Sequence, residues 1–163
     1  MSAARAMGLA AMLAVLPSAC HTAGPAPLRL WVPHSSAEVL RISAAKAADL
    51  GFKVTQRDST RGSLSATRDA AGTGNADYIL CSDSANTRGV EGDEYFQSIV
   101  AFTVTASDSG GGAAVGIEVS VPDAWAPMFA GNGAMHWRCS SSGGLEKLIA
   151  AALGGPGRRV TGP

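Results

Sequence analysis

A strict alternation of apolar residues with small or polar ones, in the second half of the chain, constrains the fold most. Val115, Ile117, Val119 and Val121 alternate with a glycine, a glutamate and a serine. Because successive side chains of a strand point to opposite faces, this pattern predicts a strand with one buried face. Pro122 follows directly and is expected to end that strand.

The same two-residue period recurs along the chain and predicts further strands. A short strand is expected at 28–32, and a hairpin at 52–67 is expected to turn at 58–62. The apolar positions of the other candidate strands are Tyr78 to Cys81, then Phe96, Val100, Phe102 and Val104, and finally Trp137 and Cys139.

Two segments have a helical period instead. Ser35 and Glu38 have the spacing of a capping box, which predicts the start of a helix, and Gly51 is expected at its C-terminal cap. Ser142 is expected to cap a second helix that ends at Gly154. The expected apolar positions are Leu40, Ala44, Ala47 and Leu50 in the first helix and Leu145, Leu148, Ile149, Ala152 and Leu153 in the second.

The order helix, strands, helix leads to one α+β domain over residues 28–154. Local hairpins favour an antiparallel sheet, of about five to six strands, and each helix has one apolar stripe to bury. A single two-layer sandwich, with the N-terminal and C-terminal helices on one face of the sheet, meets both demands. This layout is similar to helix-grip and related small folds of envelope lipoproteins.

The N-terminus has the pattern of a signal peptide. Arg5 precedes an uninterrupted apolar stretch at 7–16. As a helix this stretch rises only about 15 Å, half of a bilayer core, which is too short for a membrane span. Ser18 and Ala19 are small residues of the kind that a signal peptidase requires. We therefore expect residues 1–19 to be a signal peptide.

Residues 16–20 read Leu-Pro-Ser-Ala-Cys and resemble the lipobox of bacterial lipoproteins. The last three residues match the family pattern, while Pro17 occupies the place of its leucine. The resemblance implies that Cys20 carries a diacylglycerol and an N-acyl chain such as palmitate, and so anchors the protein to a membrane. His21, where an aspartate would mark inner-membrane retention, implies the outer membrane.

We therefore expect a lipoprotein that is located at the outer membrane and faces the periplasm. Residues 20–27 are small and rich in proline, as expected of a tether between lipid and domain, and 155–163 are expected to be a disordered tail. Ordinary cleavage, giving a soluble periplasmic protein, is the alternative.

Two further cysteines agree with export. Cys81 and Cys139 form an even pair, and an oxidising compartment favours a disulfide between them. The alternative is two separate buried thiols, since a free cysteine packs as a small hydrophobe. Their spacing has no pattern of metal ligands, so we expect no zinc site.

The sequence gives little support to catalysis, metal binding or nucleic-acid binding. Charge is balanced, with 13 Lys+Arg and 13 Asp+Glu, and no basic run appears, which argues against a nucleic-acid partner. Several weak patterns of chemically active residues favour structural roles. They are His34 with Glu38, His136 with Cys139, the acidic run Glu91, Asp93 and Glu94, the glycines Gly72 and Gly74, and Ser140 to Ser142. We expect no enzyme activity, no cofactor and no metal.

One segment suggests a contact surface. Trp125, Met128 and Phe129 lie between Pro122 and Gly131 in a stretch with neither helical nor strand period. Large apolar residues in a loop either cover a core edge or mark a surface for a partner. Both interpretations stay open.

Two functional classes remain. The first is a non-enzymatic envelope lipoprotein that binds or helps to assemble a protein partner at the outer membrane. The second is a periplasmic binder of a small molecule or lipid, with a cavity between helices and sheet lined by Phe102, Val104 and Ile117.

Overall fold

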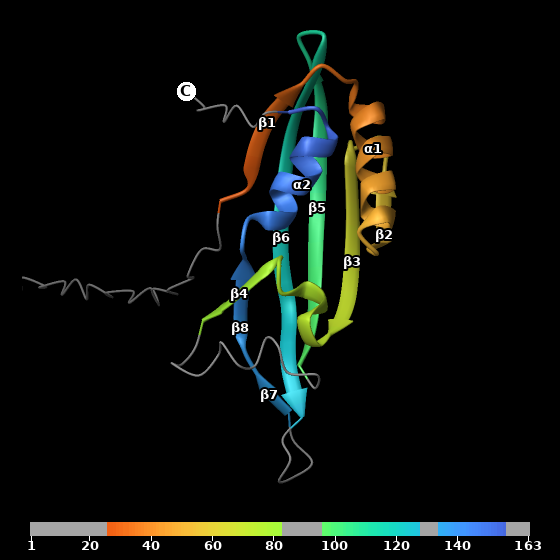
Figure 1. Ribbon diagram of the computed structural model, residues 1–163. Helices are drawn as coiled ribbons and strands as arrows, with labels where there is room; N and C mark the ends of the chain where they lie inside the picture. The colour runs from red at the N-terminus through yellow and green to blue at the C-terminus, as the bar shows by residue number, and fades with distance from the viewer. Residues whose placement is uncertain (1–25, 83–95, 128–133, 156–163) are drawn as a thin grey trace, which may run out of the picture.

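A long antiparallel hairpin, formed by β5 (Gln97–Ser109) and β6 (Gly112–Pro127), runs through the centre of the fold (Figure 1). The computed structural model describes residues 26–82, 96–127 and 134–155. The other elements, in chain order, are β1 (Leu28–Val32), α1 (Ser36–Asp49), β2 (Lys53–Asp58), β3 (Ser63–Ala71), the 3₁₀ turn η1 (Gly72–Asn75), β4 (Ile79–Ser82), β7 (Ala134–His136), β8 (Arg138–Ser141) and α2 (Gly144–Ala152).

The main sheet has the strand order β1-β6-β5-β3-β2, and every neighbouring pair is antiparallel. β7 joins the same sheet by pairing with the end of β6. Both helices pack on one face: α1 contacts β3 and β5, α2 contacts β6, and the helices contact each other (Figure 1). The predicted α+β arrangement, with two helices on one face of an antiparallel sheet, is therefore confirmed.

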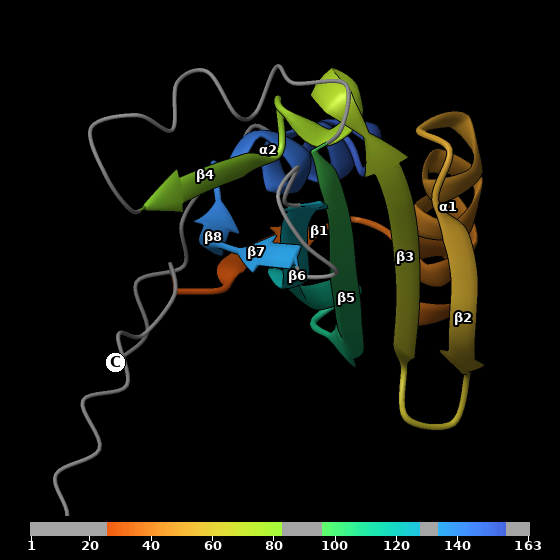
Figure 2. The same cartoon turned by 90° about the horizontal axis from the view of Figure 1, so that it is seen from below.

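β4 and β8 differ from the prediction, because they form a separate two-stranded sheet. Figure 2 shows this pair on the opposite side of the molecule from β2 and β3. The short strand predicted around Trp137 and Cys139 is in fact two strands, β7 and β8, which pair with different partners. The chain changes partner at Trp137, whose backbone N–H donates to the carbonyl of Ala124 at 2.8 Å.

The prediction that Pro122 ends its strand is wrong, since β6 continues to Pro127. Ala101 pairs with Ser120, but Ile99 pairs with Asp123, so β6 advances by one extra residue between these two pairs. This irregularity is a β-bulge, where the ladder is locally interrupted and a residue without an N–H is tolerated. Pro122 lies within the bulge, and β6 therefore continues past this proline.

Helix α1 begins and ends where the sequence predicts. The Ser35 hydroxyl accepts the N–H of Glu38 at 3.3 Å, and Gly51 follows the helix with a φ of 76°. Its buried face is rotated relative to the prediction. The buried residues are Val39, Leu40, Ser43 and Ala47, whereas Ala44 and Leu50 are only partly buried. Val39 is larger and more apolar than Ala44, so its burial removes more apolar surface from water.

Helix α2 begins one residue later than predicted. Gly143 is the N-cap, and the Ser142 hydroxyl accepts the N–H of Gly144 at 3.2 Å instead of capping the helix itself. The core-facing residues are Leu145, Glu146, Ile149, Ala150 and Leu153, while Leu148 and Ala152 are exposed. Burial of Glu146 is possible because the Ser141 hydroxyl lies 2.7 and 2.9 Å from its two carboxylate oxygens.

The core between sheet and helices is filled by side chains. Phe102 and Phe52 meet edge to face, with ring centroids 5.2 Å apart. Val104 and Ile117 are fully buried beside them. Aromatic pairs of this geometry add to the free energy gained by burial. The helical face of the sheet is thus packed, and within the described residues no helix covers the opposite face.

Candidate functional site

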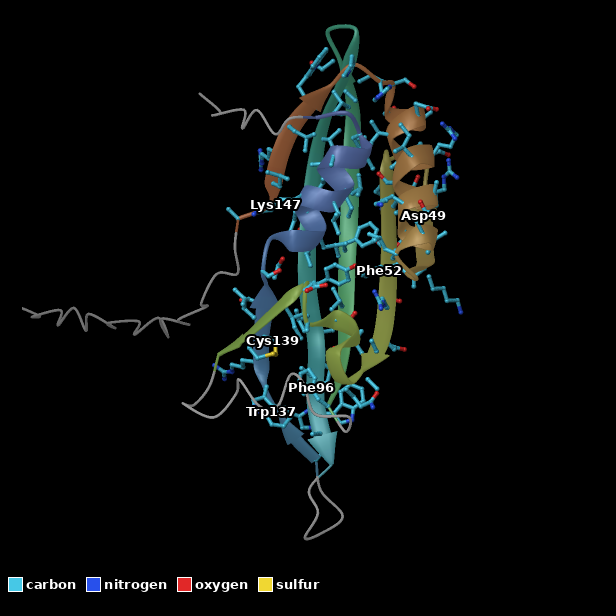
Figure 3. All side chains as sticks on the ribbon, viewed as in Figure 1. Asp49, Phe52, Phe96, Trp137, Cys139 and Lys147 are labelled. Carbon is cyan, nitrogen blue, oxygen red and sulfur yellow. A yellow bond between two sulfur atoms is a disulfide. The ribbon has the colours of Figure 1, made fainter. Side chains whose placement is uncertain are left out.

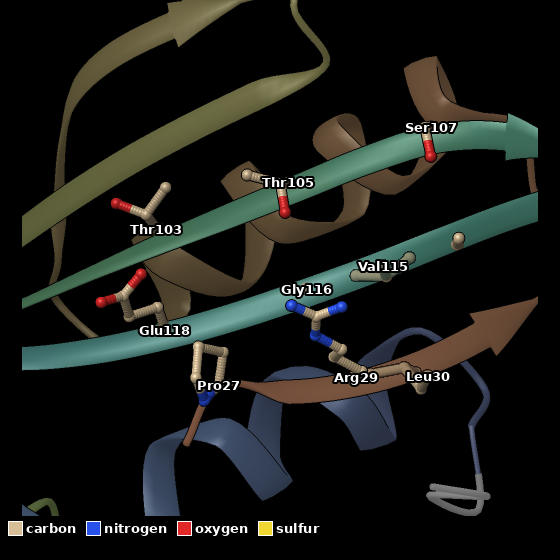
Figure 4. Close-up of a pocket in the computed structure, with 10 residues that line it drawn as sticks. Pro27, Arg29, Leu30, Thr103, Thr105, Ser107, Val115, Gly116 and Glu118 are labelled. Atoms are coloured by element: carbon tan, nitrogen blue, oxygen red, sulfur yellow. The ribbon is translucent and has the colours of Figure 1, made fainter. Parts of the chain in front are cut away.

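The face of the main sheet opposite α1 and α2 holds a groove of about 500 Å³ (Figure 4). In this view the helices lie behind the strands, so the groove opens away from them. It runs along β1, β6 and β5. Its lining residues are Pro27, Arg29, Leu30, Thr103, Thr105, Ser107, Ala114, Val115, Gly116 and Glu118.

The two-residue period of the strands builds this groove. In β6, Val115 and Ile117 point into the core, so Ala114, Gly116 and Glu118 point to the open face. The first two have little or no side chain, which creates the depression. A Cβ at Gly116 would lie only 2.8 Å from the Thr105 hydroxyl, so a side chain there would fill the depression and force the Thr105 side chain to rotate away. The floor of the groove therefore depends on Gly116.

Arg29 and Glu118 give the groove one positive and one negative charge. The guanidinium of Arg29 reaches from β1 toward Gly116, and Glu118 lies beside Thr103 (Figure 4). Both residues are exposed. The ion pairs formed within the described ranges join other residues: Arg41 with Glu38, Arg61 with Asp58, and His136 with Asp123. Arg29 and Glu118 are therefore both available to charges on another molecule.

Hydroxyl groups line the β5 side of the groove. Thr103, Thr105 and Ser107 alternate with buried residues along this strand. The Thr103 hydroxyl is 3.0 Å from the hydroxyl of Ser65 on β3, and one donates to the other. The open face thus offers donors and acceptors in rows that follow the strands.

Trp31 lies on the same face, next to the groove. It pairs across the strands with Ala114, and 47% of its surface is exposed. Its indole N–H donates to the carbonyl of Ser109 at 3.2 Å, and its ring lies over Gly112, where a Cβ would collide with it. The ring is therefore held in place with one side accessible to a partner.

The predicted disulfide between Cys81 and Cys139 is confirmed. The two residues lie directly opposite each other in the β4–β8 pair, with Cα atoms 3.9 Å apart. Figure 3 shows it above Phe96 and Trp137, whose rings meet edge to face at 5.6 Å. The bridge therefore joins the small sheet across its middle and has a structural role.

The predicted contact segment is only partly described. Trp125 does not lie in a loop, which corrects the sequence interpretation: it belongs to β6, pairs with Gln97 and His136, and is partly buried. The strand period was hidden by the extra residue of the bulge. Met128 and Phe129 lie outside the described residues, as do Cys20 and the acidic run at 91–94.

The weak chemical patterns have structural partners. His136 Nδ1 lies 2.9 Å from Asp123 Oδ1, and Cys139 is in the disulfide, so these two residues form no catalytic pair. Glu38 binds Arg41, and this hydrogen bond holds the pKa of the Glu38 carboxyl below its usual value. In the part of the chain that the structure describes, no cluster of His, Cys, Asp or Glu has the grouping of a metal site.

Sequence reasoning did not single out the groove. Its residues occupy the polar positions of the alternation that predicted the strands, and such positions usually face solvent. The sequence signal that could have indicated the groove is a glycine, Gly116, two residues before the charged Glu118 on the same face of one strand. Arg29 joins them only through the pairing of β1 with β6, which no local pattern reveals.

No protein-family model matches the chain, and no curated protein matches it in sequence. Among solved structures, the chain is similar to a DUF4468 family protein from Bacteroides ovatus, with a TM-score of 0.38 and 12% sequence identity. That match covers 82% of this chain and 87% of the other. A likeness at this level assigns neither a family nor a function. Among the described helices, none is long and apolar enough to cross a membrane.

Proposed function

We propose that this protein is a non-enzymatic outer-membrane lipoprotein, anchored through Cys20 and facing the periplasm, that binds or helps to assemble an envelope protein. The open face of the main sheet is its binding surface. The observation that supports this proposal most is the groove on that face, where Arg29 and Glu118 have no ion-pair partner among the described residues.

Two features support a binding role for this face, and a third supports export. Charged groups without a partner among the described residues are available for specific contacts. The fixed ring of Trp31 offers a rigid aromatic surface, a residue type that often dominates binding energy. The disulfide supports an oxidising compartment, in agreement with export.

The alternative function, a small-molecule or lipid binder, receives less support. It requires a cavity between helices and sheet, but Phe102, Val104 and Ile117 fill that space. The groove on the open face is lined by other side chains and is open to solvent.

Site-specific photo-crosslinking in living cells tests the proposal. A photoreactive amino acid replaces Thr105, which is exposed in the groove, and in a control strain it replaces Lys147, which is exposed on α2. We expect a defined crosslinked product from position 105 and none from position 147. Absence of a product at 105, with both variants folded and exported, would contradict a binding role for the open face.

A further inference from the structure

We propose that the partner seated on the open face is a second copy of this chain, so that the protein forms a face-to-face dimer through its main sheet. This inference rests on the proposed function, because it names the occupant of the same surface. The main support for a dimer is that Arg29 and Glu118 lie close together on one exposed face.

The two charges lie in neighbouring rows across the sheet. Arg29 belongs to a row in which it pairs with Gly116, and Gly116 pairs with Thr105. Glu118 pairs with Thr103 in the next row. Side chains of one face in successive rows are two residues apart, a spacing of about 6.8 Å along a strand.

Consider a two-fold axis that lies between the two sheets, parallel to them and perpendicular to the strands, midway between these two rows. Such an axis makes the surface complementary to itself. Rotation about this axis places the Arg29 row of one copy over the Glu118 row of the other, with β5 and β6 over their own symmetry mates. Arg29 and the second copy's Glu118 then lie one strand apart. For sheets about 10 Å apart and strands about 4.8 Å apart, their Cα atoms are about 11 Å apart, which the two side chains span together.

Symmetry makes this contact twice in each dimer. A two-fold interface uses the same patch on both copies, so it requires each charge to meet its opposite across the axis. One cation and one anion on the same face, in adjacent rows, satisfy that requirement. Two like charges in these positions would repel in the same arrangement.

The shape of the face also suits a second sheet. Gly116 and Ala114 form a low floor, which gives the Arg29 side chain of each copy room to turn toward the Glu118 of the other. β5 and β6 extend to both sides of the axis, so these two strands face their mates, whereas β1 lies on one side of the axis and β2 and β3 lie almost entirely on the other. Aligned packing of two twisted sheets is a common arrangement.

Charge reversal tests this geometry by sedimentation and light scattering. The full chain carries Cys20→Ser and is purified from the periplasm, so the result does not depend on the anchor. We expect the starting protein to be a dimer. Arg29→Glu and Glu118→Arg should each weaken the dimer at least about tenfold, because each creates two like-charge contacts. Lys147→Glu makes the same charge change on α2 and should have no effect.

Mixing the two charge-reversed proteins gives the sharpest result. One copy then has glutamates at both positions and the other has arginines, so both contacts across the axis are attractive again. We expect a heterodimer from the mixture, and a restored homodimer from the double variant Arg29→Glu/Glu118→Arg. Circular dichroism and thermal unfolding confirm that each variant is folded.

The inference is overturned by a starting protein that is monomeric at about 100 μM, since specific protein–protein interfaces associate at micromolar concentrations or below. It is equally overturned if the charge-reversed proteins dimerise as well as the starting protein, or if they fail to associate on mixing. A crosslink from position 105 to a different envelope protein, and never to a second copy, overturns it while the proposed function stands.

Discussion

The carboxylate of Asp108 accepts two hydrogen bonds from Ser36, one from its backbone N–H at 2.6 Å and one from its hydroxyl at 3.0 Å. Ser36 is the first residue of α1, and Asp108 lies near the end of β5. A negative charge at this position interacts favourably with the helix dipole and satisfies an N–H that has no partner within the helix. The contact therefore fixes the start of α1 to the tip of the long hairpin.

We expect Asp108→Ala to lower the free energy of unfolding by about 1–2 kcal/mol, as loss of a helix cap does. Asp69→Ala is the matched control, because Asp69 is exposed on β3 and its side chain has no hydrogen bond or ion pair within the described residues. The control should change stability by no more than about 0.5 kcal/mol. Urea denaturation measures both, and equal losses would show that the Ser36 contact contributes nothing.

Gly62 permits the close approach of the β2–β3 turn to β5. Its φ is 62°, and its carbonyl accepts the N–H of Ala106 at 2.7 Å. A Cβ at this position would collide with the carbonyl oxygen of Ala106. Gly110 has a similar φ of 58° but nothing within 4 Å of its Cβ position. Substitutions at the two positions therefore distinguish the cost of a left-handed backbone, which both share, from the cost of a steric collision, which only Gly62 has.

We expect Gly110→Ala to cost about 1 kcal/mol from the left-handed backbone alone. Gly62→Ala should cost about 1–3 kcal/mol more, because the added methyl group displaces a paired strand. Thermal unfolding of the two variants, measured side by side, gives the difference. A Gly62 variant as stable as the Gly110 variant would disprove the close contact.

The disulfide closes a loop with a sequence separation of 58 residues. We expect replacement of Cys81 or Cys139 by serine to cost about 2–5 kcal/mol, because the unfolded chain gains conformational freedom. The double variant should be no less stable than the single ones. Thiol titration of the denatured protein without reductant, in the Cys20→Ser background, should detect no free thiol before replacement and one after a single replacement.

Most of the fold could be predicted from local patterns. The alternation at 115–121 predicted a strand with one buried face, and the capping residues Ser35 and Gly51 predicted the ends of α1. The failures have a common cause in tertiary pairing. The bulge at Pro122 shifts the period by one residue, and the change of partner at Trp137 divides a continuous apolar pattern into two strands. No local signal distinguishes these events from the end of a strand or from its continuation.

The candidate site was less predictable than the fold. The disulfide followed from the number of cysteines and from the compartment, so it needed no geometry. Arg29 and Glu118 are far apart in sequence, and each alone is an ordinary surface charge. Only the order β1-β6-β5 places them on one groove. Conversely, Trp125 was singled out because its strand period was masked, not because it lies on an open surface.

The carboxyl of Glu38 should titrate below its usual pKa. Arg41 donates to both of its oxygens, at 2.9 and 2.6 Å, and this hydrogen bonding is the main cause of the lower pKa. Since the pKa falls on folding, the stabilising contribution is present above the unfolded-state pKa and is lost as the pH falls through the folded-state value. Arg41→Gln should raise the pKa of Glu38, as followed by NMR titration, whereas Lys46→Gln on the same helix should leave it unchanged.

The anchor is tested by changing the one cysteine of the lipobox-like motif. Cys20→Ser removes the thiol to which a lipid would be attached, so we expect the protein to move from the membrane fraction to the soluble periplasm and to lose incorporation of labelled palmitate. Cys139→Ser is the matched control, since it also removes one cysteine but should keep the label on each surviving molecule. A wild-type protein that is already soluble, unlabelled and cleaved after a different residue would contradict the lipoprotein assignment. The binding role proposed for the open face would then belong to a soluble periplasmic protein, because nothing in the groove depends on the anchor.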